Sequence, residues 1–143
     1  MFWARKNVEE KVYGSVAEKV ATEAEGLYRS GKMHCAEAVL SSVKNAFAPH
    51  VGDEVVRLAA GFGHGSGSGC ICGAVSGATM AFGVVLDGDR RGASKLTREL
   101  HRWFKSEYGA TCCKVLSANG TSGCLALTAS VAGKAAELLQ EKK

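Results

Sequence analysis

The sequence predicts an all-α fold, a single-domain multi-helix bundle of about six to seven helices. Apolar residues recur at helical spacing in several segments, each bounded by a capping residue, a glycine or the only proline. No segment alternates apolar and polar residues as a half-buried strand does. The chain has 143 residues, of which 46% are hydrophobic and 22% charged, a length and composition typical of one compact domain. We therefore expect one helical domain over residues 1–143.

Three helices are expected in the first 60 residues. Apolar residues on one face predict an amphipathic helix over about residues 7–29. The same spacing returns at residues 36–47, where Pro49 closes a second helix. A shorter helix is predicted over residues 53–60, with Asp53 as its N-cap.

The second half of the chain begins with a glycine-rich segment, residues 61–69, in which every second residue is glycine. Because glycine loses the most backbone entropy on ordering, this segment is predicted to be a loop that serves a purpose. Later helices are expected at residues 70–86 as the buried centre, at residues 93–108 up to Gly109, around residues 112–116, and from a cap at Thr121 or Ser122 onward.

Four of the six cysteines, Cys35, Cys72, Cys113 and Cys124, stand at or just inside predicted helix starts. A helix N-terminus carries partial positive charge and free N–H groups, which favour thiolate over thiol. If short connections make successive helices antiparallel, the four cysteines meet near one pole of the bundle. Converging thiolates repel one another, so the quartet predicts a bound metal or cluster, or oxidation to disulfides.

Other residues near the quartet are further candidates. Cys70 and Cys112 adjoin it as resolving thiols or alternative ligands, and His34 is a candidate metal ligand beside Cys35. Gly69 and Gly73 are expected to let backbone N–H groups approach the sulfur site or its cofactor. The glycine spacing superficially resembles a nucleotide cradle, but the required preceding strand and the Gly-Lys-Ser/Thr run are missing.

The charge pattern argues against nucleic acid as a partner. The net charge is only +4. Glu99 and Glu107 reduce the positive charge of the basic stripe on the predicted helix at residues 93–108, so this stripe is interpreted as a solvated face. No stretch of about 18 apolar residues predicts a membrane span, and the first residues lack the apolar core of a secretory signal, so a cytoplasmic location is expected. The stripe comprises Arg91, Lys95, Arg98, Arg102 and Lys105.

The run Cys72-Gly-Ala-Val-Ser-Gly77, with Cys35 upstream and Cys113 and Cys124 downstream, resembles the signature of the redox-active C_GCAxxG_C_C family. The resemblance covers about residues 25–140. It implies a redox role for these four cysteines, whereas Cys70 and Cys112 go beyond the signature. Members are often encoded near transporters, and a related domain of split-Soret cytochromes looks like an iron–sulfur module. Haem attachment is not implied, because the chain has no Cys-x-x-Cys-His.

Three functions stay open from the sequence. The first is a redox protein, an electron carrier or oxidoreductase with an unknown partner protein, which holds an iron–sulfur cluster or cycles between dithiol and disulfide. The second is a zinc-binding or other metal-sensing module without turnover. The third is a helical interaction protein with merely buried cysteines and no cofactor.

Overall fold

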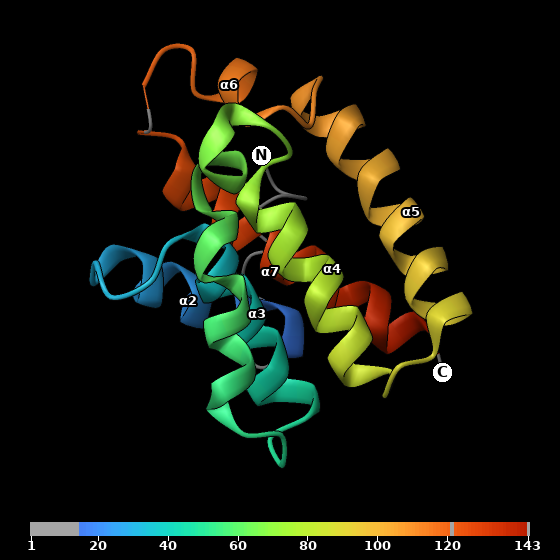
Figure 1. Cartoon of the computed structure of the whole chain (residues 1–143). Coiled ribbons are helices and arrows are strands. Elements are labelled where there is room, and N and C mark those ends of the chain that lie inside the picture. Colours follow the sequence, from blue (N-terminus) through green and yellow to red (C-terminus); the bar gives the residue numbers. More distant parts are fainter. Residues whose placement is uncertain (1–14, 121, 143) are drawn as a thin grey trace, which may run out of the picture.

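The computed structural model describes residues 15–120 and 122–142 and confirms the all-α prediction (Figure 1). Within these residues there is no strand, only one antiparallel bridge between Ile71 and Cys112. Six α-helices and two short irregular helices follow one another: α2 (Val16–Arg29), α3 (Cys35–Phe47), η1 (Asp53–Phe62), η2 (Gly65–Gly69), α4 (Gly73–Val85), α5 (Arg90–Tyr108), α6 (Cys113–Leu116) and α7 (Cys124–Glu141).

Helix α4 is the centre of the bundle. In Figure 1 it lies between α3 and α5, with α7 crossing behind it, and it packs against all three. Its apolar residues extend around the whole helix, as expected for a buried element. Phe82 is fully buried here, as are Phe104 of α5 and Val131 of α7. No helix in the described ranges is long and apolar enough to cross a membrane.

Two glycines of α4 set how closely it approaches α3. Gly73 and Gly77 are four residues apart and therefore share a helix face. A Cβ atom on Gly77 would collide with the carbonyl oxygen of Ala36, and one on Gly73 would lie 2.5 Å from Cys35 Sγ. The two glycines thus allow the backbones of α3 and α4 to touch beside the first residue of α3.

Helix α2 packs along α7 and covers the core from the other side. Its N-cap is Ser15, whose hydroxyl accepts a hydrogen bond from the Glu18 N–H at 3.1 Å. The predicted helix extended back to residue 7, but residues 7–14 lie outside the described part of the chain. Its buried residues are Ala17, Val20 and Ala24.

A helix is present over the predicted residues 53–60, but the predicted cap was wrong. The segment is a 3₁₀ helix that continues to Phe62, and Gly52 is its N-cap. Asp53 instead forms an ion pair with Lys44, whose ammonium group lies 3.2 Å away. Lys44 is only 2% exposed and also donates a hydrogen bond to the Val51 carbonyl at 2.6 Å. The Asp53 carboxylate, which the local sequence predicts to cap the helix, is therefore paired with the buried Lys44 instead.

The starts of α5 and α7 also differ from the predictions. Helix α5 begins three residues earlier than expected, because Asp89 caps it by accepting the Gly92 N–H at 3.1 Å. Helix α7 begins at Cys124 behind Gly123, so Ser122 is not its cap, and Thr121 lies outside the described residues. Gly109 ends α5 in the left-handed conformation, as predicted. The five basic residues of the stripe are all exposed.

Candidate functional site

Four helix starts meet around one cavity of about 40 Å³. Cys35 is the first residue of α3, Cys72 is the N-cap of α4, and Cys113 and Cys124 begin α6 and α7. All four side chains line this cavity. The structure therefore brings the predicted quartet together. The other residues that line the cavity are Tyr28, His34, His64, Gly73, Leu116, Ser117, Leu127 and Thr128.

The chain just after the glycine-rich segment positions one wall of the cavity by pairing with the chain before α6. The Cys72 N–H donates to the Thr111 carbonyl at 2.7 Å, and the Cys113 N–H donates to the Cys70 carbonyl at 2.5 Å. Gly65 has a φ of +64°, and a Cβ atom there would lie 2.7 Å from the Cβ atom of Cys113. Only glycine fits this position without strain, because a left-handed backbone and a close neighbour coincide. The loop thus holds Cys72 and Cys113 at neighbouring points of the cavity.

The sequence predicted lowered cysteine pKa values, and the structure reverses this prediction for three of the four. Burial raises the pKa of Cys72 to about 12, and nearby Cys35 and Cys113 add to the rise. Burial also raises the pKa of Cys35 and of Cys124, and the charge of Cys113 raises both further. Desolvation in an apolar cavity disfavours thiolates more than helix N-termini favour them. Without a compensating cation, these three groups are thiols at neutral pH.

Hydrogen-bond donors nevertheless point at the buried sulfurs. The backbone N–H groups of His64 and Ala36 lower the pKa of Cys35 against the larger effect of burial. At Cys72 the corresponding groups of Ala74 and Val75, in the first turn of α4, act in the same direction on the pKa. The Tyr28 hydroxyl does so for the pKa of Cys124. Thiolates in this cavity would therefore be stabilised by hydrogen bonds once their charge was balanced.

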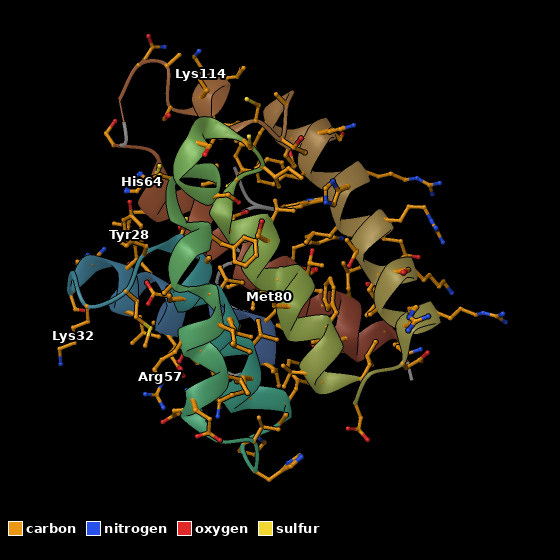
Figure 2. All side chains as sticks on the ribbon, in the orientation of Figure 1. Tyr28, Lys32, Arg57, His64, Met80 and Lys114 are labelled. Atoms are coloured by element: carbon orange, nitrogen blue, oxygen red, sulfur yellow. The ribbon has the colours of Figure 1, made fainter. Side chains whose placement is uncertain are left out.

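Tyr28 and Thr128 belong to the cavity although the sequence did not single them out as site residues, and His64 of the glycine-rich segment lines it as well. Figure 2 shows Tyr28 and His64 on the same side of the molecule, and the His34 and His64 rings meet edge to face at 5.2 Å between centroids. Thr128 follows Cys124 by four residues, which is about one helical turn. That spacing of four residues was the only signal available.

Of the other predicted site residues, some line the cavity and others lie outside it. His34 and Gly73 line the cavity with the quartet. Gly69, Cys70 and Cys112 do not line it. Gly69 instead packs against the side chain of Lys114, and the Cys112 thiol donates a hydrogen bond to the Gly69 carbonyl at 3.1 Å.

The four cysteine side chains of the cavity are, as thiolates, a soft set of donor atoms. Thiolates are ligands for zinc, copper(I) and iron–sulfur clusters. Thr128 is fully buried, and its Oγ1 is the only buried side-chain nitrogen or oxygen atom in residues 15–120 and 122–142 without a hydrogen-bond partner. A bound group with acceptor atoms would satisfy this hydroxyl. As placed, no three His, Cys, Asp or Glu side chains of the described residues are arranged to hold a single metal ion.

Alkaline pH is expected to destabilise the reduced, metal-free protein. The unfolded cysteine titrates at about pH 8.5, whereas the pKa of Cys72 in the fold is about 12, so the unfolded state loses its proton first. The stability is therefore complete below the unfolded pKa and falls as pH rises between these two values. Urea unfolding at about pH 7.5 and about pH 10 measures the loss. Cys72→Ala should show a smaller decrease, and an equal decrease would contradict this assignment.

A family model described as "Putative redox-active protein (C_GCAxxG_C_C)" matches residues 33–138. No curated protein and no solved structure matches the chain significantly. The matched region contains all four cysteines of the cavity and the two glycines at which α4 meets α3. The chain belongs to the C_GCAxxG_C_C family of redox-active proteins.

Proposed function

We propose that this protein is an electron carrier whose quartet, Cys35, Cys72, Cys113 and Cys124, holds an iron–sulfur cluster. The observation that carries the proposal is the convergence of four cysteines, each from a different helix, on one small cavity. A bound cluster would supply one-electron transfer. The four cysteines would hold it, and the unpartnered Thr128 hydroxyl would hydrogen-bond to a sulfur atom.

The raised cysteine pKa values favour a ligand role over free thiol exchange. A thiol attacks a disulfide as thiolate, and burial raises the pKa of Cys72 to about 12, so little thiolate forms there at neutral pH. A cationic centre removes this obstacle, because its charge stabilises the deprotonated sulfur. The buried position that makes Cys72 a poor nucleophile is therefore compatible with ligation.

Residues around the quartet would tune such a centre. The N–H groups of Ala36 and His64 face Cys35, and those of Ala74 and Val75 face Cys72. Hydrogen bonds to cluster sulfurs stabilise the more negative, reduced state, whereas an apolar environment destabilises it. The balance between these donors and the buried walls would set the reduction potential.

The test is the content of iron and acid-labile sulfide, with a visible spectrum, in protein purified without air. We expect both in the natural protein, and we expect Cys72→Ser to lose both together with the visible absorption. Cys112→Ser is the matched control, because Cys112 does not line the cavity and should keep the wild-type content. Zinc in place of iron would overturn electron transfer and support a metal-sensing module.

Dithiol–disulfide cycling is the second candidate, and one observation favours it. The charge of Cys113 raises the pKa of Cys124, so these two thiols lie close together. The charges of both also raise the pKa of Cys35. Oxidation of two such thiols would release two protons and two electrons to a partner disulfide. Protein without iron, sulfide or zinc that reversibly loses two titratable thiols would support this function against the cluster.

A further inference from the structure

Cys70 is an exposed thiol, and its backbone is hydrogen-bonded to Cys113, a member of the quartet. Ile71 forms the antiparallel bridge with Cys112, so the register places Cys70 opposite Cys113. The hydrogen bond from the Cys113 N–H to the Cys70 carbonyl, at 2.5 Å, fixes this pairing.

The backbone separation in such a pair suits a disulfide. The hydrogen bond from the Cys113 N–H to the Cys70 carbonyl holds the two Cα atoms within about 6 Å of each other, and disulfides span about 4.4–6.8 Å between Cα atoms. Gly65 gives independent evidence that the two residues are close. A Cβ atom on Gly65 would lie 2.5 Å from the Cys70 nitrogen and 2.7 Å from the Cys113 Cβ atom. Cys70 and Cys113 therefore both lie next to the position where a Gly65 side chain would begin.

Cys112 is the competing partner for Cys70, and the geometry disfavours it. Cys112 is bridged to Ile71 and not to Cys70. Its thiol donates to the Gly69 carbonyl at 3.1 Å. The Cys70 sulfur is directed instead towards the Ser68 carbonyl, 3.9 Å away within the glycine loop.

We propose that Cys70 is a thiol–disulfide exchange site that reacts with low-molecular-weight disulfides and passes the oxidation to Cys113. The Cys70 thiolate attacks the small disulfide, which releases one small thiol and leaves a mixed disulfide. Cys113 then attacks the Cys70 sulfur, which releases the second small thiol and forms a Cys70–Cys113 disulfide. Two protein thiols are oxidised, and the small disulfide takes up their two electrons and two protons. The Cys113 sulfur is then no longer available to the quartet as a thiolate.

The test treats the full chain with oxidised glutathione, blocks the remaining thiols with N-ethylmaleimide and maps cross-linked tryptic peptides. Trypsin places Cys70 and Cys72 together in peptide 58–90, and Cys112 and Cys113 together in peptide 106–114. We expect a cross-link between these peptides in the natural protein. It should persist in Cys112→Ser and disappear in Cys70→Ser. Loss in Cys112→Ser, persistence in Cys70→Ser, or no cross-link in the natural protein would overturn the proposal.

The consequence for the quartet has a separate measurement, which rests on the proposed function. If the quartet holds a cluster, glutathione disulfide should release iron from the natural protein and spare the iron of Cys70→Ser. Equal release from both would show that Cys70 does not control the loss. The peptide map needs no metal, so failure of the cluster proposal and failure of the exchange proposal give different results.

Discussion

Gly77→Ala is expected to lower the free energy of unfolding by about 2 kcal/mol, although alanine is the better helix former. The added Cβ atom would collide with the carbonyl oxygen of Ala36 and lie 3.0 Å from its carbonyl carbon and Cα. These are backbone atoms, so no side-chain rotation relieves the contact. Helices α3 and α4 must separate, and the start of α3 carries Cys35. Urea unfolding measures the stability, and iron content measures the effect on the quartet.

Gly83→Ala is the matched control, since Gly83 belongs to the same helix and has nothing within 4 Å of an added Cβ atom. This variant should be more stable by about 0.5–1 kcal/mol, because alanine restricts the unfolded chain and favours the helix. The same substitution thus has opposite signs at two positions six residues apart in α4. A stable Gly77→Ala protein would show that α3 and α4 do not need the close approach.

Much of the fold was predictable because the main helices have strong local signals. The apolar periodicity of α3 and α5, the break at Pro49 and the left-handed Gly109 are visible in the sequence. The exact caps were less predictable, because they depend on contacts between distant segments. The sequence predicted Asp53 as an N-cap, but its carboxylate forms an ion pair with the buried Lys44.

The site was predictable in its cysteines but not in its electrostatics. Helix starts locate Cys35, Cys72, Cys113 and Cys124, and antiparallel connectivity brings them together. The direction of their pKa shifts depends on how much water remains around them, which the sequence does not express. The same holds for Tyr28, because a tyrosine near the end of a surface helix gives no sign that its hydroxyl reaches Cys124.

Thr128→Val is expected to have opposite effects on the empty and the loaded protein. The Thr128 hydroxyl is fully buried without a partner among the described residues, and an unsatisfied buried polar group costs about 1–3 kcal/mol. Valine has the same shape and no polar atom, so it should raise the free energy of unfolding of the metal-free protein. If the hydroxyl donates to a cluster sulfur, the same substitution should lower the reduction potential of the loaded protein, because the reduced state loses a stabilising hydrogen bond.

Thr79→Val is the control that separates this effect from a general preference for valine. The Thr79 hydroxyl lies in α4, away from the cavity, and donates to the Val75 carbonyl at 3.0 Å. Losing that satisfied hydrogen bond should lower stability slightly and leave the potential unchanged. Stabilisation by Thr128→Val with an unchanged potential would mean that the hydroxyl faces the cavity but touches no bound group. If Thr128→Val destabilises the empty protein, the Thr128 hydroxyl already has a hydrogen-bond partner there, such as a buried water, and does not need a ligand to satisfy it.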